Sequence, residues 1–237
     1  MTRFPARFPL LGILLTAAAG GFAMTGQTQA QVAPTAAELT RYTGLHATAS
    51  TGDLGLLERL IAARADLDAR DSHGRTPVHV ATFARQRDAI RMLARAGAAL
   101  DLLENDRYDA VTIAAVADDE QTLRVLLSLG ASARQVTSRY DGTALIAAAH
   151  LGHDGVVRQL IAAGAPLDYV NNLHWTAVIE SIVLGNGGPR HVETLRALVT
   201  AGASIRITDR QGLTPLALAQ ARGYREMVDI LEKANVH

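Results

Sequence analysis

Residues that could do acid–base chemistry gather between positions 171 and 193, in the segment NNLHWTAVIESIVLGNGGPRHVE. Glu180 lies inside an apolar run there, with His174 before it and His191 after it. A carboxylate and a histidine that share a closed pocket can act as general acid and general base. The segment therefore raises the hypothesis of a small acid–base enzyme centred on Glu180.

A second interpretation makes Glu180 a surface carboxylate that bonds a neighbouring turn or a donor on another protein. Burying it without a partner would be costly, so it must reach solvent or find a donor. We favour this second interpretation, because acid–base catalysis needs an enclosed pocket and a second reactive group. A thin stack of repeats, which the spacing below predicts, offers neither readily.

Other patterns with chemical potential lack a necessary component. His150 and His153 could share one helical face as metal ligands, but no third ligand is evident nearby. The cluster at residues 118–120 lacks calcium-loop spacing, and the glycines at 185–188 follow a predicted helix instead of a strand. The chain has no cysteine and no glycine-flanked serine elbow. We predict no metal, no cofactor and no catalytic residue.

Composition limits the class of partner. The 237 residues carry 23 basic and 23 acidic side chains, and 49% are hydrophobic but only 4% aromatic. A neutral balance provides no long-range attraction for nucleic acid or anionic lipid. The apolar residues are mostly small and aliphatic, which favours closely packed helices.

The N-terminus is typical of an export signal. Arg3 and Arg7 precede an apolar run over residues 8–24, and small residues at Thr28 and Ala30 suit an export peptidase. We expect residues 1–30 to be a signal peptide cleaved after Ala30, and residues 31–36 to be a flexible tail. The alternative is an uncleaved membrane anchor, for which the run is short and interrupted by proline and glycine.

An internal repeat organises the remaining sequence. Related four-residue motifs begin 33, 33, 34, 33 and 38 residues apart, at Thr43, Thr76, Asp109, Thr143, Thr176 and Thr214. A glycine–alanine pair recurs with the same spacing, with its glycines at positions 97, 130, 164 and 202. Two independent markers with one period predict a stack of similar units, each touching mainly its neighbours.

Each unit predicts a helix, a loop, a second helix and a projecting turn. Threonine can cap the first helix and proline suits its first position, as in Thr76–Pro77. The second helix shows apolar residues at helical spacing, and glycine suits its C-terminus. The five residues that lengthen the fifth unit lie between its two helices, so we expect an enlarged loop over Gly185–His191.

These residues resemble the ankyrin repeat, most clearly at 71–81 (DSHGRTPVHVA) and 208–217 (TDRQGLTPLA). The resemblance implies an all-α solenoid of stacked helical hairpins, with finger-like turns along a concave groove. It also implies that His46 and His79 tie neighbouring turns together. The amino-acid sequence of several units is similar to that of a group of exported bacterial ankyrin proteins, which implies a periplasmic location. Six repeats would fill residues 37–237, at about 37–70, 71–103, 104–137, 138–170, 171–207 and 208–237.

In the register of the repeat, Trp175 and Tyr108 both lie immediately before a predicted helix start, near the tip of a turn. Trp, Tyr and Arg often dominate binding energy at protein interfaces. An alternative is that some of these rings pack between adjacent turns. We predict that a partner protein is bound by turn residues and inner-helix residues together, namely Arg75, Tyr108, Tyr140, Trp175, Phe83, His150 and Glu180.

The sequence thus favours a monomeric, non-enzymatic protein-binding module in the bacterial periplasm, without nucleic-acid or membrane partners after signal cleavage. The alternatives are the enzyme centred on Glu180 and an assembly scaffold held in the envelope by its N-terminal segment.

Overall fold

The computed structural model describes residues 31–235. The expected signal peptide over residues 1–30 lies outside the described residues. Within the described part the regular elements are thirteen α-helices: α1 (Ala36–Arg41), α2 (Gly44–Thr51), α3 (Leu54–Ala62), α4 (Pro77–Phe83), α5 (Arg87–Ala96), α6 (Ala110–Val116), α7 (Glu120–Ser128), α8 (Ala144–Leu151), α9 (Asp154–Ala162), α10 (Ala177–Val183), α11 (Pro189–Thr200), α12 (Pro215–Arg222) and α13 (Arg225–Ala234).

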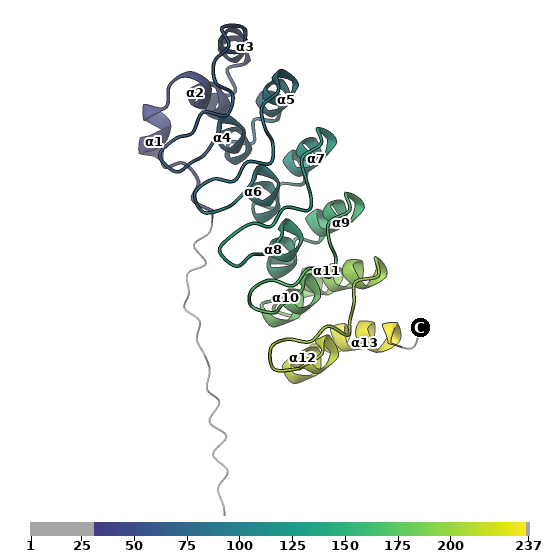
Figure 1. The fold of residues 1–237 in the computed structure, drawn as a ribbon. Coiled ribbons are helices and arrows are strands. Elements are labelled where there is room, and N and C mark those ends of the chain that lie inside the picture. Colours follow the sequence, from purple (N-terminus) through teal and green to yellow (C-terminus); the bar gives the residue numbers. More distant parts are fainter. Residues whose placement is uncertain (1–30, 236–237) are drawn as a thin grey trace, which may run out of the picture. The chain divides into compact units, whose positions relative to one another are not determined.

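Helices α2 to α13 form six pairs stacked one on the next (Figure 1). The even-numbered helices pack on one another as an inner row, and the odd-numbered helices from α3 to α13 form an outer row behind them. None of the helices in residues 31–235 combines the length and apolar composition needed to cross a bilayer. The expected all-α stack of helical hairpins is confirmed.

The inner helices begin where the sequence markers predict. Thr143, Thr176 and Thr214 each cap a helix by accepting the N–H three residues ahead, at 3.3 Å. Asp109 does the same in the third unit, with Oδ1 2.7 Å from the Thr112 nitrogen. Asp109 therefore preserves the cap in the unit that departs most from the motif.

The core follows the repeat. In the first five units one recurrent position of the outer helix holds a fully buried aliphatic residue, with 0% exposure at Leu57, Ile90, Leu123, Val157 and Leu195. The inner helices bury small residues such as Ala81, Ala114 and Ala148, at 0 to 1% exposure. Small side chains let the inner helices approach closely, which explains how so few aromatic residues suffice to fill this fold.

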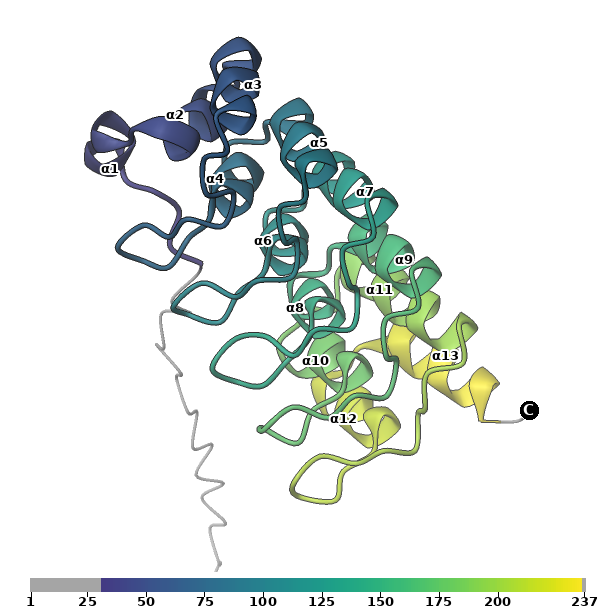
Figure 2. The same cartoon turned by 45° about the horizontal axis from the view of Figure 1, so that its top comes forward.

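The turns that enter units two to six project side by side from the inner row (Figure 2). We call them fingers 2 to 6: residues 71–75, 104–108, 137–142, 171–175 and 209–213. Each closes on itself through its backbone, as in Asn171 N–H to Trp175 oxygen at 3.0 Å and Thr137 N–H to Gly142 oxygen at 2.7 Å. Finger 4 holds one residue more than the others, and its Tyr140 lies two residues before Gly142, which takes the position of Trp175 in finger 5.

Neighbouring fingers are tied together. The His46 Nε2 atom lies 2.9 Å from the Arg75 oxygen, and the His79 Nε2 atom lies 3.2 Å from the Tyr108 oxygen. Burial lowers the pKa of His79 to about 4, so its ring is neutral. His79 Nδ1 also accepts from the Thr76 N–H at 3.1 Å, so His79 links the end of finger 2 to finger 3 as expected, whereas His46 joins α2 to finger 2.

Candidate functional site

The residues predicted to bind a partner divide into exposed and enclosed members. Tyr140 on finger 4 is 43% exposed, whereas Tyr108 and Trp175 on the flanking fingers are half-buried. Trp175 packs against the core. Phe83 and His150, from equivalent positions of α4 and α8, are also half-buried. These five side chains remain available, in whole or in part, at the edge formed by the fingers and the inner helices.

Arg75 does not belong to that surface. Its side chain is 1% exposed, because the guanidinium turns inward from finger 2 toward α1. Its Nε atom donates to Asp71 Oδ2 at 2.6 Å, its Nη2 atom pairs with Glu38, and its Nη1 atom donates to the Val32 oxygen at 3.0 Å. The prediction that Arg75 faces a partner has no support in this geometry, since its hydrogen-bonding groups are used inside the molecule.

The same contacts order the start of the described chain. Thr35 caps α1, its hydroxyl 3.2 Å from the Glu38 nitrogen, and Glu38 accepts in return from the Thr35 N–H at 2.7 Å. These capping bonds and the Arg75 guanidinium lower the pKa of Glu38 to about 2. Within residues 31–36, which we expect to be a flexible tail, the Val32 oxygen accepts from Arg75 of finger 2 and Thr35 bonds Glu38 of α1.

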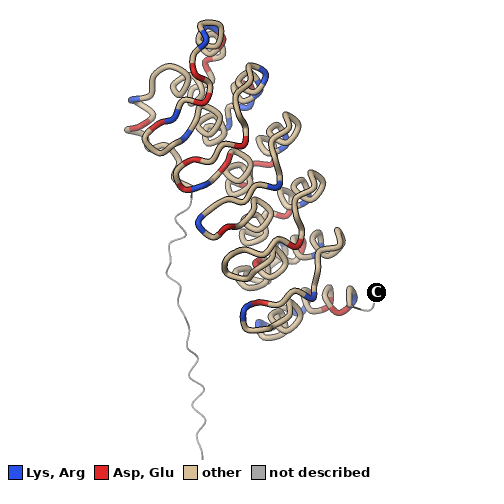
Figure 3. The backbone as a smooth tube through the Cα atoms, viewed as in Figure 1, with Lys and Arg blue, Asp and Glu red and all other residues tan. Residues whose placement is uncertain are grey.

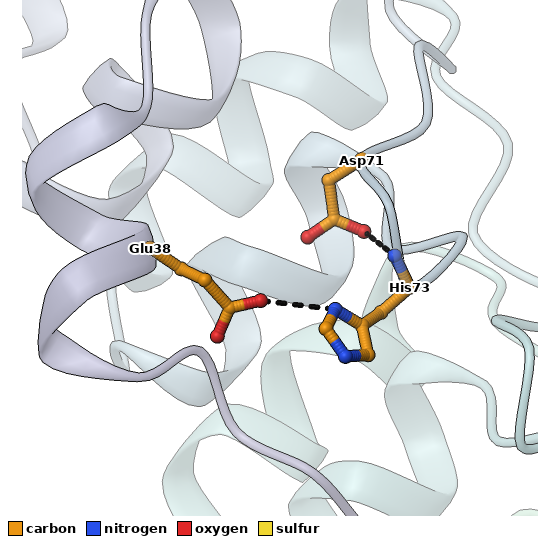
Figure 4. A group of neighbouring side chains, drawn as sticks. All are labelled: Glu38, Asp71 and His73. Carbon is orange, nitrogen blue, oxygen red and sulfur yellow. Dashed lines mark hydrogen bonds and ion pairs between the residues drawn. The ribbon is translucent and has the colours of Figure 1, made fainter.

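Glu38, Asp71 and His73 could by their spacing hold a cation (Figure 4). Their ligand atoms all lie within 4.8 Å of one another. The Arg75 guanidinium is already among them, with Nη2 3.2 Å from His73 Nδ1 and bonds to both carboxylates. Arg75 supplies the positive charge that an ion would bring, so the cluster is best described as an internal ion-pair network.

Glu180 is almost fully buried and has few hydrogen-bond partners. The residue is 4% exposed, and its Oε1 atom accepts a hydrogen bond from Asn171 Nδ2 at 2.9 Å. Its Oε2 atom lies 3.6 Å from His150 Nδ1, too long for a good hydrogen bond. Burial raises the pKa of Glu180 to about 7 against the opposing effect of Asn171, and burial also lowers the pKa of His150.

The histidine near Glu180 is therefore His150, whereas the enzyme hypothesis paired Glu180 with His174 or His191. His174 is exposed on finger 5, and His191 is bonded to Asn186 at 3.1 Å and to the His150 oxygen at 2.9 Å. Sequence reasoning missed the Glu180–His150 pair. The repeat register could have predicted this pair, because Glu180 lies four residues after Thr176 and His150 lies seven residues after Thr143.

A closed pocket around Glu180 was the requirement of the enzyme hypothesis. Two surface hollows, of about 340 and about 400 Å³, lie beside α5 and between α9 and α11. Neither is lined by Glu180 or by a histidine. These hollows give the acid–base alternative no support.

The enlarged loop of the fifth unit is engaged inside the molecule. Arg190 pairs with Asp118 at 2.9 Å and with Asp154 at 3.2 Å, and the Tyr224 hydroxyl donates to the Gly185 oxygen at 3.0 Å. Gly187 has φ +67°, and a Cβ there would lie 2.5 Å from the Tyr224 ring. The loop thus links units three to six.

Charge does not single out a site for a strongly charged partner. Basic and acidic residues are interspersed along the stack of repeats (Figure 3). On the finger tips Arg107 and Asp141 pair with each other at 2.7 Å. Fingers 3, 4 and 5 share instead an aromatic residue, namely Tyr108, Tyr140 and Trp175.

Comparison with known proteins agrees with this architecture. The family model for ankyrin repeats, in three-copy form, matches residues 15–104, 45–139 and 103–209. The chain is 30% identical to the ankyrin repeat protein YahD of Escherichia coli (strain K12) over 184 residues, covering 77% of this chain and 91% of that protein.

Solved structures show the same fold. The ankyrin repeat domain ABAYE2397 of Acinetobacter baumannii AYE superposes with a TM-score of 0.76 at 40% identity, over 81% of this chain and 97% of that one. A chain in the complex of the predatory endopeptidase Bd0816 of Bdellovibrio bacteriovorus with the immunity protein Bd3460 has a TM-score of 0.67 at 22% identity, over 81% and 98%. The helix pairs, the fingers, the family match and these relatives together establish that this chain belongs to the ankyrin-repeat family.

Proposed function

We propose that this protein is a non-enzymatic binding module of the bacterial periplasm, which holds a partner protein along its fingers and inner helices. Ankyrin repeats generally mediate binding between proteins, and a chain of this fold occurs in the endopeptidase–immunity protein complex. The proposal specifies where on this chain the partner binds and in which compartment.

The observation that carries the proposal is the run of aromatic residues on three consecutive fingers. Tyr108, Tyr140 and Trp175 lie on fingers 3, 4 and 5, and Tyr140 keeps 43% of its surface exposed. Tyrosine and tryptophan provide large contact areas at little cost in conformational entropy. Partly exposed residues at one recurrent inner-helix position, Phe83, Val116, His150 and Val183, extend this surface.

The direct test is capture of the partner after crosslinking in the periplasm. Tyr140→Ala and Trp175→Ala should each reduce capture at least about tenfold, since residues of this kind dominate interface energy. Leu56→Ala is the matched control, because Leu56 is 36% exposed but lies on outer helix α3. Full capture by both finger variants, with unchanged helical circular dichroism, would contradict the proposed surface.

The compartment is tested separately. The N-terminal arginines, the apolar run and the small residues before Gln31 support export with cleavage after Ala30. N-terminal sequencing of protein from the periplasmic fraction should then begin at Gln31. An intact N-terminus in the membrane fraction would instead support the envelope-anchored scaffold.

A further inference from the structure

Glu180 is an unusual residue for its place in the repeat. The equivalent position of every other inner helix holds an apolar residue, namely Ala47, Val80, Ile113, Ala147 and Leu218. Four of these six positions, including Glu180 itself, are buried. An ionisable carboxylate has therefore been placed where packing alone would favour an aliphatic side chain.

Asn171 matches this departure. In fingers 2 and 6 the equivalent residue is an aspartate, and Asp71 and Asp209 each accept two finger N–H groups through Oδ1. Asn171 Oδ1 does the same for Leu173 and Trp175 at 3.0 Å, which leaves its amide Nδ2 free to donate to Glu180. An aspartate could close the finger but would repel Glu180. The two substitutions together keep a carboxylate beneath the Trp175 finger.

The arrangement leaves one carboxylate oxygen incomplete. Within residues 31–235, Asn171 is the only hydrogen-bond donor to the Glu180 side chain, and no arginine or lysine pairs with it. The Glu180 side chain keeps 5% of its surface exposed, and Oε2 is not among the side-chain atoms that are both fully enclosed and unbonded. A buried carboxylate with a reachable, unbonded oxygen favours a donor, and a positive donor most of all.

We propose that a partner segment inserts an arginine or lysine side chain between the Trp175 finger and His150, where it bonds Glu180 Oε2. This inference rests on the proposed function and specifies the partner's chemistry. The flanking surface includes Tyr140 on finger 4 and Val183 and Leu184 at the end of α10, and the Arg222 guanidinium donates to the Val183 oxygen at 3.3 Å. The partner segment therefore carries a basic residue between apolar ones, and arginine can also stack on an aromatic ring.

A displayed library of random peptides tests the inference, because it samples basic, acidic and apolar segments together. The library is selected in parallel on the purified full-length wild type, on Glu180→Gln and on Glu193→Gln. Glu193 is the matched control, because it is a carboxylate on α11 with 50% side-chain exposure. Peptides with Arg or Lys flanked by apolar residues should be enriched on the wild type and on Glu193→Gln, but not on Glu180→Gln.

Binding of a synthetic peptide from that selection gives the quantitative measure. We expect it to bind the wild type at least about tenfold more tightly than Glu180→Gln, because a charge-assisted hydrogen bond is lost. Replacing the basic residue of the peptide by glutamine should cause a similar loss. Equal affinity for the wild type and Glu180→Gln, peptides without a basic residue, or no enrichment on the wild type would each overturn the inference.

The two proposals fail differently. Peptides that lack a basic residue but lose affinity for Trp175→Ala would refute the role of Glu180 and leave the binding surface intact. Peptides whose affinity survives Trp175→Ala and Tyr140→Ala would refute the surface itself. Circular dichroism of each variant confirms that the repeat stack is retained in these comparisons.

Discussion

Fingers 2 and 5 have the same shape but treat a buried charge in opposite ways. In finger 2, Asp71 closes the turn and holds Arg75, whose remaining donors reach Glu38 and the Val32 oxygen. In finger 5, Asn171 closes the turn and holds Glu180, which gains a single hydrogen bond. The first charge is neutralised within the chain, whereas the second is not. We infer that finger 2 is a structural clasp and that finger 5 is prepared for a charge from outside.

The largest expected effect is on the clasp. Arg75→Ala leaves Asp71 and Glu38 without their cation, and we expect it to lower the free energy of unfolding by about 3 to 5 kcal/mol, as for other broken buried pairs. Urea titration followed by circular dichroism measures this loss. Arg91→Ala is the control, since Arg91 pairs at 2.9 Å with the exposed Asp88 and such pairs contribute about 1 kcal/mol or less. A loss below about 1 kcal/mol for Arg75→Ala would contradict the clasp.

Ionisation of Glu180, the α10 carboxylate that finger 5 holds, should instead lower the free energy of unfolding as pH rises. The pKa of Glu180 is raised to about 7 in the folded protein from an ordinary value of 4.5. Below pH 4.5 the side chain is protonated in both states, so its ionisation costs nothing. Between pH 4.5 and 7 the unfolded chain loses the proton more readily, so stability falls, and above pH 7 the full cost of up to about 3 kcal/mol remains.

Comparison of the wild type with Glu180→Gln isolates this effect. The glutamine keeps an oxygen for Asn171 and does not ionise, so the variant should gain stability relative to the wild type as pH rises from 4.5 to 7. Urea titrations at pH 4, 5, 6, 7 and 8 give the difference curve. Glu193→Gln should run parallel to the wild type throughout. A flat difference for Glu180→Gln would mean that Glu180 ionises as freely in the folded state as in the unfolded one.

Exchange of the two partners in finger 5 sharpens the comparison further. Asn171→Asp gives finger 5 the closing residue of finger 2, but places it against Glu180. We expect a loss of about 2 kcal/mol at pH 8, because a hydrogen bond becomes a repulsion. The double variant Asn171→Asp with Glu180→Gln restores a donor and an acceptor, and should recover most of that loss. Failure to recover would show that the two side chains do not interact directly.

The sequence predicts the local parts of this comparison. Thr143, Thr176 and Thr214 cap inner helices where the 33-residue period places them, and His79 links two successive turns as the family resemblance implies. These features depend on neighbouring residues or on one unit touching the next. Repetition makes such contacts predictable from the sequence, because the residues that form them recur several times along the chain.

The missed features depend on distant or unrepeated residues. Arg75 occupies the same position in its repeat as Trp175. That position does not predict that the Arg75 guanidinium turns toward Glu38, 37 residues earlier. The Arg190 bridge to Asp118 spans 72 residues and two units. An irregular α1 and a single inserted loop create these contacts once each, so no periodic pattern predicts them.

Replacement of Asp109 should have the smallest effect on stability. It also distinguishes the enclosed unbonded oxygen of Asp109 from the unbonded oxygen of Glu180. Its Oδ1 atom caps α6, but Oδ2 is buried without a partner, and burial raises the pKa of Asp109 to about 6. Five of the six units use threonine at this position. Asp109→Thr should keep the cap, remove the buried oxygen and raise the free energy of unfolding at pH 7 by about 1 kcal/mol.

Urea titration at pH 7 measures that gain, and Asp109→Ala is the matched control because it removes the cap together with the oxygen. The threonine variant should also bind the selected peptides as the wild type does, since Oδ2 of Asp109 is fully enclosed and no outside donor can reach it. Glu180 Oε2 is also unbonded, but the Glu180 side chain keeps 5% of its surface exposed. Lost peptide binding in a folded Asp109→Thr variant would show that reachability is the wrong criterion for telling a binding carboxylate from an imperfect cap.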